Sequence, residues 1–117
     1  MIELTAKQRK FLEKKAQPLS ALVQVGGAGL TEEQVKNINN IFKSHELIKI
    51  KYNVIKSLAM AEERAEVADA RNTLDSDIEQ NTNSTHVRTI GNVAIFYKAA
   101  EKADDQEFEA DLKKLAK

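Results

Sequence analysis

Helical and strand-like patterns alternate along this chain, and their order limits the folds open to it. Two segments begin with a capping box, in which a threonine is followed three residues later by a glutamine: Thr5 with Gln8, and Thr31 with Gln34. The pair Gly91-Asn92 suits a two-residue hairpin turn between two β-rich runs. The expected elements are a helix at 5–17, a strand at 19–25, a helix at 31–44, a strand at 45–54, a long helix at 57–80, a hairpin at 85–98 and a terminal helix at 104–117.

The order α-β-α-β-α-β-β-α predicts an α/β fold in which helices cover a small mixed four-stranded sheet. At 117 residues the chain has about the length of one domain. It begins with a stretch that is polar within a few residues, and it contains no cysteine. We therefore expect a cytoplasmic monomer without disulfides, thiolate metal sites or a cofactor.

The net charge is zero, but the charges are segregated along the chain. Residues 1–56 hold 10 Lys and Arg against 5 Asp and Glu, whereas 57–98 hold 4 against 7 and 99–117 hold 4 against 6. A basic half can concentrate a polyanion even on a neutral molecule, because salt screens each charge beyond about 10 Å. The cations that we assign to such a surface are Lys7, Arg9, Lys10, Lys14, Lys49, Lys51 and Arg88.

Three of the four glycines lie between the first predicted strand and the second predicted helix. Glycine permits positive φ and close approach of another backbone, and a helix start offers free N–H groups with partial positive charge. Phosphate suits this geometry, and KH domains clamp RNA backbone with a Gly-x-x-Gly loop. The alternative is a simple tight turn, which a lone Gly-x-x-Gly favours. The candidate contacts are Gly26, Gly27, Ala28 and Gly29, with the amides near Leu30 and Thr31.

The stretches "LTAKQRKFLEKKAQPL", "LVQVGGAGLTEEQVKNI", "HELIKIK" and "VRTIGNVAIFYK" occur in this order in the chain. Together they resemble the successive signatures of the CRM domain family in its stand-alone bacterial YhbY form, over about residues 3–98. The resemblance implies an α/β domain similar to KH domains and to the C-terminal domain of the third bacterial translation initiation factor. It also implies binding to ribosomal RNA in precursors of the large ribosomal subunit, without catalysis. The domain would span residues 1–98, followed by an acidic helical extension at 99–117.

The chain departs from the family pattern in two places. Gly27 and Ala28 carry neither charge nor side-chain donors where family loops commonly hold a basic or polar residue, so backbone contacts would dominate there. The segment between Lys51 and Arg88 is longer and more acidic than the family pattern, and the acidic tail after Lys98 is an addition.

A second function class stays open beside RNA binding. The acids of the long helix and the tail are typical of a solvated face, but a protein-interaction adaptor would use them to bind a basic partner such as a ribosomal protein, with the glycine loop serving as a turn. His45 and His86 are too isolated in sequence to predict a metal site. No set of nucleophile, base and orienting residue is evident, so we do not expect an enzyme. The acids concerned are Glu62, Glu63, Glu66 and Asp69.

Overall fold

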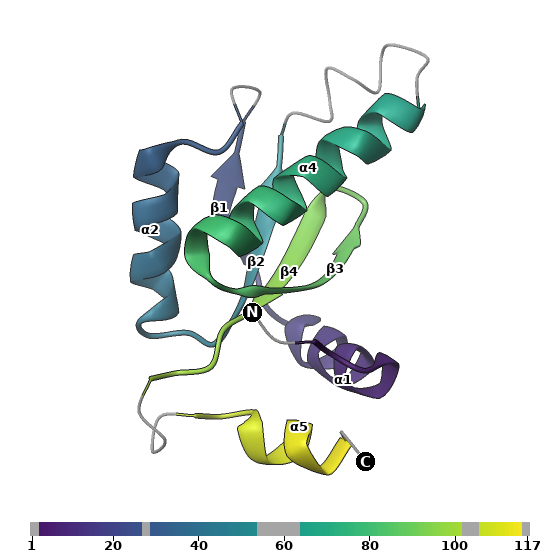
Figure 1. Ribbon diagram of the computed structural model, residues 1–117, viewed down its shortest axis with the longest axis vertical. Helices are drawn as coiled ribbons and strands as arrows, with labels where there is room; N and C mark the ends of the chain where they lie inside the picture. The colour runs from purple at the N-terminus through teal and green to yellow at the C-terminus, as the bar shows by residue number, and fades with distance from the viewer. Residues whose placement is uncertain (1–2, 27–28, 54–63, 102–105, 116–117) are drawn as a thin grey trace.

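The computed structural model describes residues 3–26, 29–53, 64–101 and 106–115 (Figure 1). Its strands β1 (Ala21–Val25), β2 (Leu47–Tyr52), β3 (Thr85–Ile90) and β4 (Val93–Tyr97) form one sheet in the spatial order β1-β2-β4-β3. β1 runs parallel to β2, and the other two pairs are antiparallel. The described helices are α1 (Ala6–Ala16), α2 (Glu32–Phe42), α4 (Arg64–Thr82) and α5 (Glu109–Leu115). The predicted α/β fold with a mixed four-stranded sheet is confirmed, while positions 57–63 of the predicted long helix lie outside the described residues.

Local sequence signals determine where the elements begin and turn. At α1, Gln8 N–H donates to Thr5 Oγ1 (3.2 Å) and Thr5 N–H donates to Gln8 Oε1 (2.8 Å), so both halves of the capping box are present. The same reciprocal pair starts α2. Ile90 pairs with Val93 across the β3–β4 turn, and Gly91 has φ +60°, a conformation that favours glycine. Each of these signals acts within a few residues, which is why the sequence alone predicts them.

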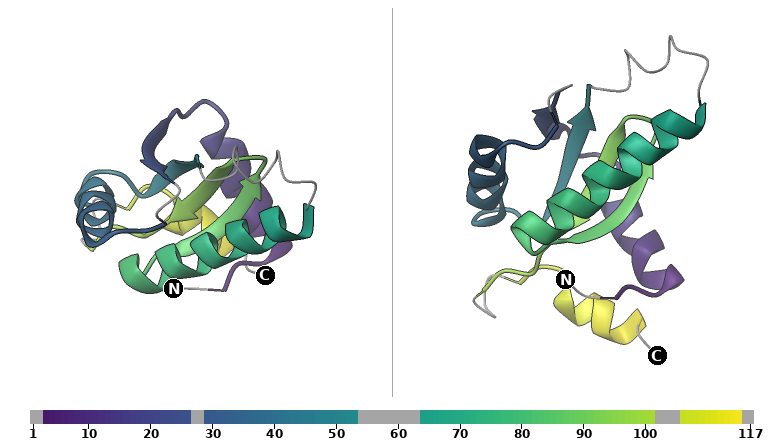
Figure 2. Two further views of the ribbon diagram at one scale, coloured as in Figure 1. Left: turned by 90° about the horizontal axis from the view of Figure 1, so that it is seen from above. Right: turned by 45° about the horizontal axis from the view of Figure 1, so that its top comes forward.

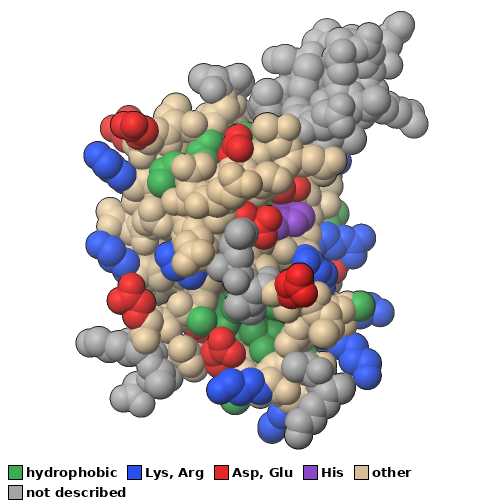
Figure 3. All heavy atoms as spheres, viewed as in Figure 1, with side chains coloured by type: hydrophobic (Ala, Val, Ile, Leu, Met, Phe, Trp, Pro, Cys, Tyr) green, Lys and Arg blue, Asp and Glu red, His purple; other side chains and the backbone are tan. Residues whose placement is uncertain are grey.

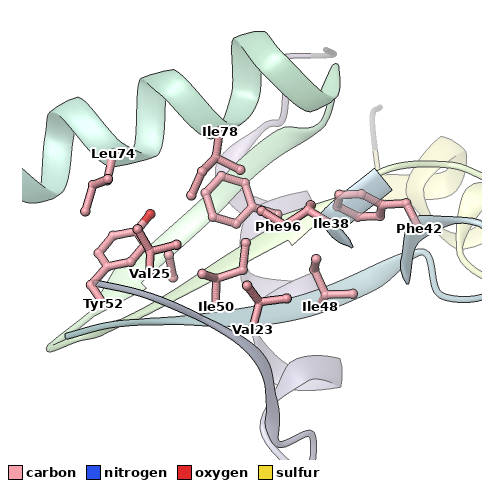
Figure 4. Close-up of a cluster of buried hydrophobic side chains, with 11 residues drawn as sticks. Val23, Val25, Ile38, Phe42, Ile48, Ile50, Tyr52, Leu74, Ile78 and Phe96 are labelled. Carbon is pink, nitrogen blue, oxygen red and sulfur yellow. The ribbon is translucent and has the colours of Figure 1, made fainter. Parts of the chain in front are cut away.

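One face of the sheet, which we call the α2/α4 face, is covered by those two helices. Viewed from above, the sheet lies between α4 on one side and α1 on the other (Figure 2). Alternate residues of β2 point to the α2/α4 face, and Leu74 and Ile78 of α4 point down onto Phe96 and its neighbours (Figure 4). This cluster forms the larger part of the core, and its buried members are Val23, Val25, Ile38, Phe42, Ile48, Ile50, Tyr52, Leu74, Ile78, Ala94 and Phe96.

The other face, which we call the α1/α5 face, has a second apolar cluster. Leu12 and Ala16 of α1 pack there, and Phe108 and Leu112 bring in α5. Tyr97 packs edge-on against Phe108, with ring centroids 6.4 Å apart. The extension therefore contributes buried side chains to this cluster, even though most of its other residues are charged or polar. No helix among the described residues is both long and apolar enough to cross a membrane.

Candidate nucleic-acid interface

The glycine loop connects the C-terminal end of β1 to the N-terminus of α2. Gly29 N–H donates to Gly26 O (3.1 Å), which closes a tight turn, and Gly29 has φ +82°. A Cβ built on Gly26 would meet no heavy atom within 4 Å, and its φ lies outside the positive range. Gly29 is therefore required by the backbone, whereas Gly26 leaves open space beside the loop. Gly27 and Ala28, which the sequence also assigns to the site, lie outside the described residues.

The N-terminus of α2 is less open to an anion than the sequence suggests. Thr31 N–H already donates to Gln34 Oε1 (3.2 Å), so one of the amides expected to bind phosphate is engaged within the capping box. Glu32 and Glu33 occupy the first turn, where their carboxylates offset the positive end of the helix dipole. Leu30 is half-buried and packs against the apolar cluster of the α2/α4 face. Attraction for a phosphate must therefore come mainly from side chains elsewhere.

The outer side of α1 supplies such side chains. Lys7, Lys10 and Lys14 are exposed, while Leu12 and Ala16 on the opposite side of the helix are fully buried. None of these three lysines has a hydrogen-bond or ion-pair partner among the residues that the structure describes. In the space-filling view, Lys and Arg side chains gather along the side of the molecule where α1 lies (Figure 3). The predicted basic stripe on the first helix is present and open to a ligand.

Two other predicted cations fasten α1 to the sheet. One terminal nitrogen of Arg9 donates to the carbonyl oxygens of His86 and Val87, both at 2.7 Å. Arg88 donates to both carboxylate oxygens of Glu13 at 3.0 Å. These contacts join α1 to β3, so both arginines help to hold the helix on the sheet, and the Arg88 side chain is still 59% exposed. The sequence did not reveal these contacts, because the acceptors lie about 75 residues away in the chain.

The two predicted lysines of β2 have different surroundings although they share one face of the sheet. Lys49 Nζ donates to the carbonyl oxygens of Gln17 (3.3 Å) and Leu19 (3.0 Å), just beyond the C-terminus of α1. Lys51 is exposed and has no such partner among the described residues. The alternation of β2 places both lysines on the α1/α5 face, but Lys51 alone remains available for an external anion.

Lys51 belongs to a row of side chains that α1 and α5 leave uncovered. Strand register aligns Gln24 with Lys51, Lys51 with Val93, and Val93 with Ile90. Val93 is half-buried, and the other three side chains are exposed. We call these four residues the open row. It crosses the whole sheet at the end where β1 leads into Gly26, so the open row adjoins the glycine loop.

A buried polar network that the sequence did not reveal lies on the α2/α4 face. Asp75 Oδ1 of α4 accepts from Tyr52 Oη (2.6 Å) and Thr89 Oγ1 (2.9 Å). His86 Nε2 lies 3.3 Å from Asp75 Oδ2 and 2.7 Å from Thr89 Oγ1. The same imidazole nitrogen makes both contacts, so the ring cannot relay a proton from the hydroxyl to the carboxylate through its two nitrogens. The network joins α4 to β2 and β3 and is not a catalytic triad.

Burial governs the protonation of this network. Burial lowers the pKa of His86 below its ordinary value, with a further decrease from Arg9, while Asp75 and Glu79 oppose the change. Burial and the hydrogen bond to Asp75 raise the pKa of Tyr52. The phenol therefore stays protonated as a donor at neutral pH. Within the described residues, no group of three or more His, Cys, Asp or Glu side chains could hold a metal ion.

Comparison with known proteins identifies the family. The model of the CRS1/YhbY (CRM) domain matches residues 4–98. This chain belongs to the CRM domain family. It is 33% identical to a protein of Haemophilus influenzae named "RNA-binding protein", over 91% of this chain and 96% of that protein. It is 32% identical to "Probable RNA-binding protein YqeI" of Bacillus subtilis, over 85% of this chain and 92% of that protein.

The fold of this CRM domain also occurs in a solved structure. The solution structure of the hypothetical protein SAV1595 from Staphylococcus aureus matches with a TM-score of 0.67 and 24% identity, covering 90% of this chain and 98% of that one. The family match ends at Lys98, immediately after β4. The extension lies beyond that match, yet Gln8 Nε2 of α1 donates to Leu112 O of α5 at 2.8 Å. In this CRM domain, α5 therefore helps to hold the basic helix, which also contacts β3.

Proposed function

We propose that this CRM domain binds RNA through its sugar-phosphate backbone, without catalysis, on a surface formed by the glycine loop, the open row and the outer side of α1. The observation that carries the proposal is that Lys7, Lys10, Lys14 and Lys51 are exposed and unpaired among the described residues. These four charges lie on α1 and on the sheet face that α1 covers. The names of the two relatives support the same function.

Each part of the surface has a distinct task in this proposal. The lysines attract phosphates without reading bases, because an ammonium group is a compact charge with no planar pattern of donors. Gly26 leaves room for the RNA backbone beside the loop. Val93 and Ile90 of the open row offer apolar surface to sugars or bases. Arg9, Lys49 and Arg88 act indirectly, since their contacts hold α1 in place.

We propose ribosomal RNA in precursors of the large ribosomal subunit as the RNA. The resemblance to the stand-alone bacterial form of the family supports this choice. Crosslinking in cells, followed by sequencing of the attached RNA, tests it directly. Enrichment of large-subunit precursor sequences is the expected result, and enrichment of messenger RNA or small-subunit RNA alone would contradict it.

The basic helix is tested by replacing Lys7, Lys10 and Lys14 together with Gln. RNA affinity, measured by fluorescence anisotropy between 50 and 200 mM salt, should fall by similar factors for unrelated single strands. The log–log salt slope should become shallower by about 2, since each single-strand phosphate contact contributes roughly 0.7. The matched control replaces three exposed lysines outside this surface, Lys36, Lys113 and Lys114, and changes net charge equally. Equal losses in both variants would reduce the effect to net charge and remove α1 from the interface.

The glycine loop is tested at Gly26, where a side chain has space and no positive φ is needed. Gly26→Asp places a negative charge beside the proposed phosphate path, and Gly26→Asn adds a side chain of nearly the same shape without charge. We expect Asp to weaken RNA binding at least about tenfold more than Asn, with both variants folded. If the two variants bind RNA equally well, the loop is only a turn and phosphate does not pass it.

A further inference from the structure

A hollow lies at the opposite end of the sheet from the glycine loop. It has a volume of about 700 Å³, which falls within the usual range of small-molecule sites. Its walls come from the last turn of α2, the last turn of α4 and the segment that follows β4. These three segments meet at the lower left of the molecule in Figure 1. None of the residues assigned to the proposed RNA surface lines this hollow.

Side-chain amides dominate the polar lining. Asn39 of α2 and Gln80, Asn81 and Asn83 at the end of α4 all line the hollow. Each amide presents an oxygen acceptor and an NH₂ donor side by side. Asn81 Nδ2 donates to Asp77 O (2.7 Å), whereas the amides of Asn39 and Gln80 have no hydrogen-bond partner among the described residues. A matching ligand must carry donors and acceptors on one edge.

Two lysines line the hollow and differ in what they can bind. Lys98 Nζ donates to Thr82 O (2.9 Å) and lies 6.0 Å from the centre of the Phe42 ring, so its position is fixed by the protein. Lys43, the C-cap of α2, is exposed and has no ion-pair partner in the described part of the chain. Lys43 can therefore neutralise an anionic group on the ligand.

The remaining lining does not suit a metal ion. Glu101 supplies a single carboxylate, which is too few oxygen ligands of negative charge for a metal ion. The carbonyl oxygen of Thr82, which also lines the hollow, already accepts from Lys98. The lining therefore offers a ligand the amide side chains and Lys43.

We propose that this hollow binds a nucleotide, with the base edge hydrogen-bonded to the amides of Asn39 and Gln80 and the phosphate beside Lys43. A nucleobase edge offers the alternating donors and acceptors that side-chain amides match, and the phosphate supplies the anion that a neutral peptide lacks. The nucleotide is either a free mononucleotide or an unpaired nucleotide of bound RNA. Only the second source rests on the proposed function.

NMR of the ¹⁵N-labelled full chain tests the proposal, since the side-chain NH₂ groups of Asn and Gln give their own signals. Titration with each of the four ribonucleoside monophosphates should shift the NH₂ signals of Asn39 and Gln80 saturably, and leave the Gly26 and Gly29 amides in place. Inorganic phosphate alone should move signals near Lys43 without saturating those of the two amides. An uncharged acetylated Gly/Ala peptide should move none of these signals.

Variants with matched controls identify the contacts. Asn39→Ala and Lys43→Gln should each weaken mononucleotide binding at least about fivefold, as expected when one hydrogen-bonded partner is lost. Asn40→Ala and Lys36→Gln are the controls, because both residues are exposed on α2 and do not line the hollow. The controls should bind as the parent does. Equal weakening in variants and controls would overturn the assignment.

A tetranucleotide distinguishes the two sources and separates this proposal from the proposed function. The NH₂ signals of Asn39 and Gln80 should shift in both titrations. If the tetranucleotide binds more tightly than the monophosphate, the bound nucleotide comes from RNA. If the two affinities are equal, the ligand is a free nucleotide. If longer RNA moves the Gly29 amide while no nucleotide or RNA moves Asn39 or Gln80, the nucleotide site is wrong and the proposed function stands. If mononucleotides move Asn39 and Gln80 but RNA binds nowhere, the proposed function is wrong. A shift caused by the neutral peptide instead of nucleotides would overturn the nucleotide assignment.

Discussion

The two faces of the sheet differ in how completely they are covered. The α2/α4 face is closed by two helices, and the Asp75 network joins α4 to β2 and β3 there. The α1/α5 face is closed over Val87, Ile95 and Tyr97, while α1 and α5 leave the open row uncovered beside the glycine loop. The first face therefore provides most of the stability, and the second combines a smaller core with a surface for a ligand. A substitution on one face should change stability, and an equivalent substitution in the open row should change binding.

The largest expected difference is between two side chains of β4 that point to opposite faces of the sheet. Phe96 is fully buried on the α2/α4 face, whereas Val93 belongs to the open row. Phe96→Ala should lower the free energy of unfolding by about 3–5 kcal/mol, because it removes a large buried side chain and leaves a cavity. Val93→Ala should cost less than about 1 kcal/mol. Urea unfolding followed by circular dichroism measures both, and similar losses would mean that the open row is part of the core.

A fully buried tyrosine on each face gives the second comparison. Tyr52 Oη donates to Asp75, whereas Tyr97 Oη is buried without a hydrogen-bond partner among the described residues. Tyr52→Phe should lower the free energy of unfolding by about 1–2 kcal/mol, since Asp75 loses a donor. Tyr97→Phe should leave it unchanged or raise it, because no bond is lost and an unpaired polar group is removed. Thermal unfolding measures the stability of both variants. A marked loss of stability in Tyr97→Phe would reveal a hydrogen-bond partner for its hydroxyl.

The third comparison uses the two lysines of β2. Lys49→Gln should cost up to about 1 kcal/mol of stability, because two carbonyl oxygens near the end of α1 lose a charged donor. Lys51→Gln should leave stability within about 0.5 kcal/mol and weaken RNA binding about threefold near 100 mM salt, as expected for one phosphate contact. Chemical denaturation and anisotropy on the same samples separate the two effects. If Lys49→Gln weakens RNA binding and Lys51→Gln does not, the RNA lies nearer to α1 than to the open row.

The smallest effect should come from pH, on the α2/α4 face alone. His86 has a lower pKa in the folded state than its ordinary value of about 6.5, so the unfolded chain binds the proton more readily. Stability from neutral His86 is therefore fully present above pH 6.5 and is lost as pH falls below it toward the lower folded value. Urea midpoints measured from pH 7.5 to 5.5 should fall, and the fall should be shallower in His86→Gln. His45→Gln, at an exposed site, is the control.

Features set by a few neighbouring residues were predictable from the sequence. Thr5 and Thr31 each start a helix through a glutamine three residues later, and Gly91-Asn92 makes the hairpin turn. The exposed lysines of α1 follow in the same way, because helical spacing separates them from the buried side. The fold class was predictable because these local signals agree with one another.

Partners far apart in the chain were not predictable. Arg9 and Lys7 look alike in sequence, yet Arg9 donates to carbonyls of β3 while Lys7 faces outward. The network around Asp75 depends on how α4 crosses the sheet, and residue spacing in the sequence does not predict that crossing. The helix start at Thr31 carries a similar ambiguity in the sequence. Its capping box signals a stable helix, but the same box occupies an amide that was assigned to phosphate.

The position of β4 in the sheet has a consequence for folding during translation. β4 is the last of the described strands along the chain, yet it lies between β2 and β3, and β3 has β4 as its only described neighbour in the sheet. Before β4 emerges, only the β1–β2 pair can form, and an isolated pair of strands is marginally stable in water. All residues up to Tyr97 must therefore be synthesised before the sheet can close. We therefore expect the nascent chain to expose its apolar strands until β4 has been synthesised and then to fold in one cooperative step.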